Sequence, residues 1–412
     1  MYNITPRYLV IFCLVAITVS NLVVAKENKQ NISWLTEQIK KHPQVKAAKE
    51  FLNAQLYEAD SLDKAIYNPE LSSDFGKEGS ERTYTLGINQ TIDFTNKRES
   101  RRQQSVFARI GAKMNYKLLM QNKMAQALNA LITWETALKR SKLVSQQEKQ
   151  LEDLLEIVKQ RNKSGDLGQL DAELTYLSLS QRFGETARIQ AQLRRAESDL
   201  RDLLPDWQNN TVDIPLNSWD TKDQQITDSL ISQHPTVQVA KARWEEAMLV
   251  AEIERKNKKA DPTIGLEAGK LGSDDVLSLT FSMPLNIRNN FSLQYKAANQ
   301  QAIAAESSYL AAVRKQKFAI QASKLALNEY DNRYKRWRTL MQGRGENSES
   351  LLQKQWKVGD ISTTEYLLTL QQRTEGLLAG IELEQEYQFA LIQLLLDTAQ
   401  LYPTQATTEK SK

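Results

Sequence analysis

The chain has 412 residues, of which 25% are charged, and its formal net charge is only +4. So small an excess of positive charge over so long a chain gives no electrostatic reason to expect nucleic-acid binding. Its single cysteine, Cys13, excludes a disulfide framework and a thiolate metal site.

Residues 1–25 have the pattern of a secretory signal peptide. Arg7 precedes an apolar run from Tyr8 to Val19, and Val23-Val24-Ala25 supplies small residues for cleavage after Ala25. The run is shorter than the ~20 residues that a spanning helix needs, so export is favoured over an uncleaved membrane anchor. No second long apolar segment follows, and the chain is either soluble or spans a membrane without helices.

The first predicted helix in each half of the remaining chain contains a His-Pro pair. These helices are expected at Asn31–Ile66 and Thr227–Lys259, with His42 and His234 just before a proline. A residue before proline at the start of a helix is typical of an N-cap. A metal-ligand role for the two histidines is the alternative.

Alternating apolar and polar residues next predict a β-hairpin in each half. The four strands are expected at Leu71–Lys77, Arg82–Phe94, Ile264–Lys270 and Asp275–Leu285. Strands of this length with one apolar face could cross a bilayer at a tilt; an ordinary sheet packed on a helix is the alternative. The smallest membrane barrels have about eight strands, so a membrane-spanning sheet here would need several chains to share one barrel.

A very long helix is predicted after each hairpin, because long proline-free stretches there are rich in helix-forming residues. Asn96–Asn162 would form a helix on the order of 100 Å long, a length that indicates a coiled coil or another extended assembly. In the second half, Gly343–Asn347 predicts a weaker break without a counterpart in the first.

Gly-Asp pairs are expected to end both long helices, at Gly165-Asp166 and Gly359-Asp360. Glycine suits the left-handed residue that closes a helix. Antiparallel return helices should follow at Gln169–Leu204 and Ser362–Leu401.

The chain therefore contains the same order of elements twice, about 193 residues apart. This period far exceeds the roughly 20 to 50 residues of a solenoid repeat. We predict an internally duplicated chain in which each repeat has the order helix, β-hairpin, long helix and return helix. The predicted boundaries are 26–215 for the first structural repeat, 216–403 for the second and 404–412 for a C-terminal tail.

These features together resemble the outer-membrane efflux protein family, the TolC-like channel proteins, over essentially the whole mature chain. The resemblance is carried by the His-Pro helix starts, the Asn-Pro and Asp-Pro strand starts, the Gly-Asp turns and the strand-to-helix junctions Asp93–Arg98 and Met283–Asn289. Within the family, Ala260–Leu266 and the second junction are most similar to the cobalt–zinc–cadmium resistance type. Phe291 is a departure, since such proteins often carry a glycine there.

The resemblance implies a mainly α-helical protein with a small β part, the TolC-like α/β-barrel fold. It implies a homotrimer in the outer membrane, in which each chain gives four transmembrane strands to one barrel and its long helices to a periplasmic coiled-coil tube. The implied function is the exit duct of a tripartite efflux pump, with a periplasmic adaptor and an inner-membrane transporter as partners. Heavy-metal cations are the first expected cargo, and drugs or other small molecules are the alternative. Rival functions are the adaptor itself, or a coiled-coil structural protein without a pore.

No catalytic motif is visible, so an enzyme is not expected, and neither a cofactor nor a metal site is expected. The candidate site is the periplasmic tip, where Asp166 and Asp360 would form acidic rings in a threefold assembly. Such rings favour cations and could help to gate the mouth; alternatively, both are ordinary turn residues that cap the next helix. The full candidate set is Gly165, Asp166, Gly359 and Asp360, with Asp171, Glu173 and Glu365 as second-line members.

Overall fold

The structure, a computed structural model, describes residues 32–208, 227–342 and 345–402. The predicted signal peptide and C-terminal tail lie outside these residues. The chain divides into two compact units, and each contains segments from both predicted repeats. We call Ala47–Leu119 together with Thr227–Phe318 the strand unit, and the rest of the described chain the turn unit.

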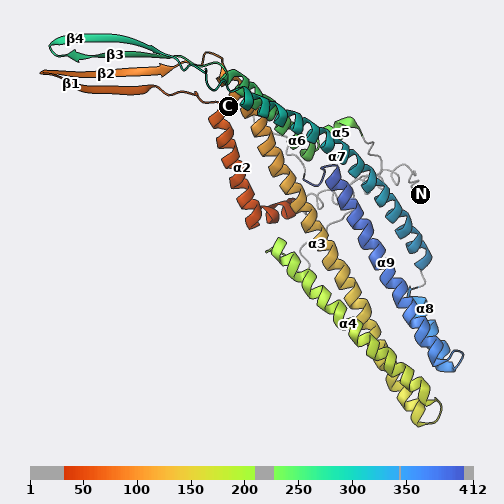
Figure 1. Cartoon of the computed structure of the whole chain (residues 1–412). Coiled ribbons are helices and arrows are strands. Elements are labelled where there is room, and N and C mark those ends of the chain that lie inside the picture. The colour runs from red at the N-terminus through yellow and green to blue at the C-terminus, as the bar shows by residue number, and fades with distance from the viewer. Residues whose placement is uncertain (1–31, 209–226, 343–344, 403–412) are drawn as a thin grey trace, which may run out of the picture. The chain divides into compact units, whose positions relative to one another are not determined.

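The strand unit contains one antiparallel sheet in the order β1-β2-β3-β4 (Figure 1). A tight turn connects the two strands of each hairpin, one at Gly79 with a φ of 64° and one at Gly272 with a φ of 63°. Glycine adopts this conformation without strain. The pairing of β2 with β3 then unites the hairpins of both repeats in one sheet. The strands are β1 (Glu70–Glu78), β2 (Glu81–Thr91), β3 (Thr263–Leu271) and β4 (Asp274–Ser282).

Two strands end earlier than the alternating pattern predicted, at Thr91 instead of Phe94 and at Ser282 instead of Leu285. Asp93 caps the next helix, because its carboxylate accepts hydrogen bonds from the backbone N–H groups of Lys97 and Arg98, at 2.8 and 2.7 Å. In the second hairpin Pro284 has no N–H to donate to a strand. The prediction of strand in these last residues was wrong.

One face of the sheet is apolar and exposed over all four strands. The exposed fractions of its apolar side chains run from 42% for Ile264 to 81% for Phe75, so no described helix covers this face. The larger side chains of the face are Leu71, Phe75, Tyr84, Leu86, Ile88, Ile264, Leu266, Leu277, Leu279 and Phe281.

The opposite face of the sheet is polar and crowded. Thr85 donates a hydrogen bond to Glu267 across β2 and β3. A Cβ atom at Gly265 would collide with the side chain of Asn89, and one at Gly269 with the backbone oxygen of Tyr84. Glycine is therefore required at both positions by close approach within the sheet.

The two expected first helices are each divided at the His-Pro pair. A helical segment over residues 32–41 precedes α2 (Pro43–Leu62), and α5 (Asp228–Ser232) precedes α6 (Pro235–Asn257). The Nδ1 atoms of His42 and His234 accept the backbone N–H groups of Gln44 and Thr236, both at 3.2 Å. The histidines thus cap new helices, and the prolines cannot continue the old ones because they lack an N–H. No group of three or more His, Cys, Asp or Glu side chains in the described residues could hold a metal ion.

The long helices run through both units. The first, α3 (Lys97–Lys163), has 67 residues without interruption. The second is divided into α7 (Ser292–Met341) and α8 (Gly345–Val358). The helix is therefore interrupted where the glycines predicted a break. Among the helices that the structure describes, none is long and apolar enough to cross a membrane.

The return helices are α4 (Gln169–Leu203) and α9 (Thr363–Asp397). The second stops short of the predicted Leu401 because Ala399 has a φ of 57°, and the backbone N–H of Gln400 instead reaches back to the oxygen of Leu395 at 2.8 Å. This left-handed residue closes the helix.

Phe291 also adopts the left-handed conformation, with a φ of 56°, directly before α7. Its counterpart before α3 is Asn96, with a φ of 57°. Asparagine tolerates this region, whereas another L-residue pays roughly 1–2 kcal/mol. The departure at Phe291 therefore places a strained residue where glycine would be unstrained.

A buried polar cluster, which we call the junction cluster, joins the sheet to α3 within the strand unit. Asp261 accepts hydrogen bonds from the Lys97 ammonium at 2.8 Å, from the Tyr67 hydroxyl at 2.7 Å and from the Phe94 backbone N–H at 3.3 Å. The side chains of Asp261 and Lys97 are only 3% and 9% exposed. Burial by itself raises the pKa of Asp261, but the hydrogen bonds from Lys97 and Tyr67 outweigh it and hold this pKa below its ordinary value. Burial and the hydrogen bond to Asp261 raise the pKa of Tyr67 to about 12.

Candidate functional site

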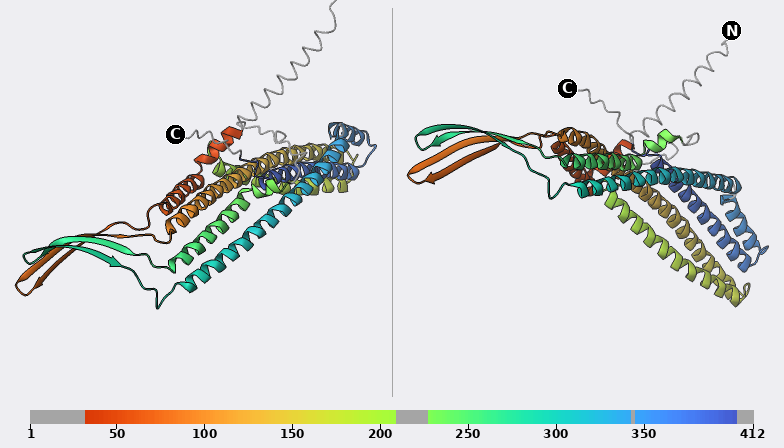
Figure 2. Two further views of the ribbon diagram at one scale, coloured as in Figure 1. Left: turned by 90° about the horizontal axis from the view of Figure 1, so that it is seen from above. Right: turned by 45° about the horizontal axis from the view of Figure 1, so that its top comes forward.

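The two Gly-Asp turns of the turn unit have the same backbone geometry. Gly165 and Gly359 have φ of 82° and 85°. The N–H of Asp166 bonds to the oxygen of Arg161, and the N–H of Asp360 to that of Gln355, both at 2.9 Å. This is the glycine-closed helix end that the sequence predicted, and α4 and α9 return beside α3 and α8 (Figure 2).

Arg161 connects one turn to the other. Its guanidinium donates a hydrogen bond to the backbone oxygen of Lys357 at 2.9 Å and lies 5.1 Å from the centre of the Trp356 ring. The structure therefore brings the two predicted turns together through a cation that sequence reasoning missed.

An apolar core directly supports the turns. At its centre, Trp356 is 2% exposed, stacks on Tyr366 with ring centres 5.5 Å apart, and donates its indole N–H to Thr363 at 3.2 Å. The helical spacing of Leu151, Leu155 and Val158 was a signal for such a core. Its buried members are Leu151, Leu154, Leu155, Val158, Ala172, Leu179, Trp356, Tyr366 and Leu370.

The predicted acidic residues have different surroundings. Asp166 and Asp360 are exposed at the turns, and Asp166 accepts a hydrogen bond from the Ser164 hydroxyl at 3.0 Å. Glu365 forms a capping box with Ser362, and the hydrogen bonds from the backbone N–H and hydroxyl of Ser362 lower the pKa of Glu365. In the first turns of α4, Asp171 is half-buried and Glu173 is exposed.

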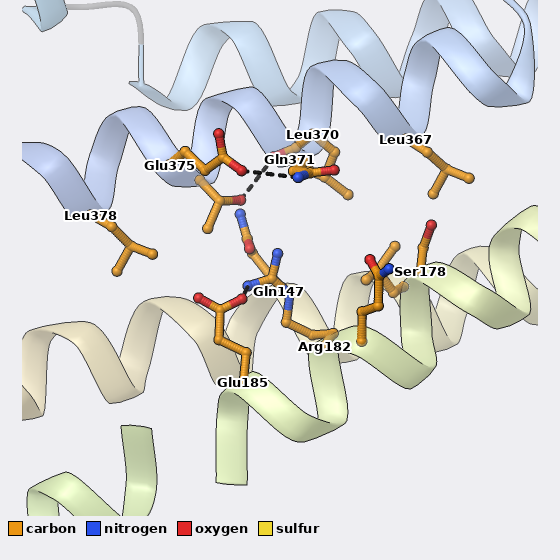
Figure 3. A pocket seen from close by; sticks show the side chains of 12 residues that line it. Gln147, Ser178, Arg182, Glu185, Leu367, Leu370, Gln371, Glu375 and Leu378 are labelled. Carbon is orange, nitrogen blue, oxygen red and sulfur yellow. Dashed lines mark hydrogen bonds and ion pairs between the residues drawn. The ribbon is translucent and has the colours of Figure 1, made fainter. Parts of the chain in front are cut away.

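A polar cavity of about 110 Å³ lies among α3, α4 and α9, next to the apolar core (Figure 3). Arg182 pairs with Glu185 at 2.7 Å on one side. The buried amide of Gln147 has no hydrogen-bond partner among the described residues. A cavity of this size and polarity can hold several waters, since each occupies about 30 Å³. The contact of α9 with α3 and α4 is thus apolar near the turns and becomes polar farther along the helices, at the cavity.

Comparison with known proteins finds matches among solved structures alone. No family model matches the chain, and no curated protein does. A membrane protein from Pseudomonas aeruginosa is 14% identical, with a TM-score of 0.76 over 90% of this chain and 93% of that chain. CusC is 12% identical, with a TM-score of 0.76 over 90% and 92%. The CmeC outer-membrane channel of Campylobacter jejuni is also 12% identical, with a TM-score of 0.74 over 91% and 86%. The chain has the TolC-like channel fold.

This TolC-like fold confirms the fold class that the family resemblance implied. Identities of 12% to CusC and 17% to the outer-membrane channel OprN do not favour one subgroup over another. The cobalt–zinc–cadmium subgroup therefore stays a prediction.

Proposed function

We propose that the protein is the outer-membrane exit duct of a tripartite efflux pump. The main supporting observation is the four-stranded sheet with one exposed apolar face and one polar face. Its strands have 9 to 11 residues, close to the length that crosses a bilayer at a tilt. The TolC-like fold, which the CmeC and OprN channels share, supports the same function.

The proposed assembly is a homotrimer. In lipid, the outer edges of β1 and β4 would leave unpaired backbone groups that each cost several kcal/mol. Joining three four-stranded sheets edge to edge gives twelve strands and satisfies both edges. An adaptor and an inner-membrane transporter are the proposed partners: the transporter would supply the energy that the passive duct lacks, and the adaptor would make the contact.

The proposed gate is the pair of Gly-Asp turns, placed at the periplasmic mouth. Since α3 begins six residues after β2 ends and rises about 1.5 Å per residue, its 67 residues would carry the turns on the order of 100 Å from the membrane. By threefold symmetry Asp166 and Asp360 would then form acidic rings.

Purified protein in planar bilayers should conduct ions, and Asp166→Asn with Asp360→Asn should change the conductance and weaken cation preference without impairing the trimer. Removing carboxylates from a ring lowers the local cation concentration. The matched control is Glu152→Gln with Asp153→Asn, two exposed acids of α3 outside the turns. An absence of conductance in any condition would favour the adaptor or the pore-less coiled coil. A normal double variant would make the two aspartates turn residues only.

The proposed cargo is heavy-metal cations, supported by the resemblance of Ala260–Leu266 and the Met283–Asn289 junction. A deletion strain should become sensitive to zinc, cobalt and cadmium. Sensitivity to organic toxicants with unchanged metal resistance would instead assign drugs or other small molecules as cargo.

A further inference from the structure

We propose that Lys77, Arg82 and Lys270 form a basic rim that binds the phosphate groups of lipid headgroups in the leaflet nearest the hairpin turns. The inference rests on the proposed function, since it requires that the strands cross a membrane. It adds a specific lipid chemistry and a specific leaflet to that function.

The register of the sheet puts the three basic residues on its apolar face. Lys77 lies directly opposite Arg82, next to the turn between β1 and β2. Lys270 lies opposite Tyr84 on one side and Asp275 on the other. All three share the face of Leu71, Leu266 and Leu279, because side chains two residues apart on a strand point the same way.

The charges of the rim are unbalanced. Lys77 and Arg82 are exposed, and neither has an ion-pair partner among the residues that the structure describes. Lys270 lies 3.5 Å from Asp275, and these two side chains are 47% and 86% exposed. Three cations and one carboxylate therefore give this face of the sheet a net charge of +2 at the rim, while the acids Glu81 and Asp274 lie on the opposite face by the register. Since like charges directly opposite on neighbouring strands are destabilising, an anion between Lys77 and Arg82 would relieve the sheet.

The order of side chains along the strands identifies that anion. The middle of the face is aliphatic, the row of Phe75 and Tyr84 follows with Lys270 at its end, and Lys77 with Arg82 comes last. Aliphatic, then aromatic, then basic is the order found from the hydrocarbon core of a membrane to its headgroups. A lipid phosphate would sit at the level of the rim while its acyl chains cover the aliphatic rows. An acidic protein segment would match the charge alone, so lipid is the occupant that fits both features.

The test compares lipids on the assembled protein in detergent. Native mass spectrometry of the wild type should show tighter binding of phosphatidic acid than of phosphatidylcholine. In Lys77→Gln with Arg82→Gln this preference should fall about thirtyfold, because each basic residue near an anionic membrane surface contributes about fivefold. The control Lys46→Gln with Lys49→Gln, which removes two exposed lysines of α2, should keep the preference.

Three outcomes would overturn the proposal. These are a wild type that does not prefer phosphatidic acid, a rim variant that keeps the preference, and competition by millimolar inorganic phosphate, which would indicate a site for free anions. The charge-preserving variant Lys77→Arg with Arg82→Lys should behave like the wild type, and the wild-type comparison stands even if the neutral variant misfolds. Conductance separates this inference from the proposed function. A protein that conducts but shows no preference for phosphatidic acid would contradict the basic rim alone. A protein that never conducts would contradict the proposed function.

Discussion

Asp261→Asn is expected to destabilise the strand unit by about 3 to 5 kcal/mol, measured as a lower midpoint of thermal unfolding. The substitution leaves the Lys97 ammonium buried without its counter-charge, and breaking a buried pair by removing one partner has costs of this size. It also weakens the acceptor for the hydrogen bonds from Tyr67 and Phe94. The effect should be large because these contacts join three separate segments of the chain.

Two further variants test that explanation. Lys97→Met combined with Asp261→Asn should recover part of the loss, since no charge is then left buried. Asp206→Asn breaks the exposed pair of Lys41 and Asp206, whose side chains are 57% and 56% exposed, and should change the midpoint little. An Asp261→Asn protein as stable as the wild type would contradict the proposed role of the junction cluster.

The same pair predicts a dependence on pH. Because the pKa of Asp261 is held below its ordinary value near 3.8, the unfolded chain binds its proton more readily than the folded one. The stabilisation is fully present above the ordinary value and is lost as the pH falls through the lowered one. Asp261→Asn should therefore lack this part of the acid-induced loss of stability.

Trp356→Ala is expected to loosen the end of the turn unit by about 3 to 5 kcal/mol, the usual cost of truncating a buried Trp. The ring is stacked on Tyr366 and covered by Arg161, so its loss leaves a cavity between the two turns. Hydrogen exchange should accelerate in residues 151–179 and 352–370. In a channel gated at these turns, the closed state should also become leakier.

Matched variants make the result specific. Trp356→Phe keeps an aromatic ring for stacking but loses the hydrogen bond to Thr363 and part of the ring volume, so it should cost less than the alanine substitution. Trp244→Ala removes a Trp that stacks on Tyr309 in the strand unit and should leave exchange at the turns unchanged. Equal exchange in Trp356→Ala and the wild type would show that the turns are held by other contacts.

Local patterns predicted most of the secondary structure. The period of two placed all four strands, and glycines placed both turns, because these features depend on neighbouring residues. The ends of β2 and β4 were wrong because the apolar alternation continues into Phe94 and Leu285, while the cap by Asp93 and the missing N–H of Pro284 decide where pairing stops.

The candidate site was predictable only in part. Its location followed from the repeat, but Arg161 and Trp356 belong to segments nearly two hundred residues apart, and no local pattern pairs them. The capping role of Glu365 has a sequence signal, since Ser362 and Glu365 have the spacing of a capping box. The polar cavity beside Gln147 depends on three packed helices and had no signal in one sequence.

The two faces of the sheet differ in the room that they leave for side chains. At Gly265 and Gly269 even one extra carbon would collide with a neighbour, whereas the opposite face carries bulky side chains that stand free. In a duct closed from such sheets, the number of strands and their stagger would set the diameter of the barrel, and the small residues of the inward face would leave more of that diameter open.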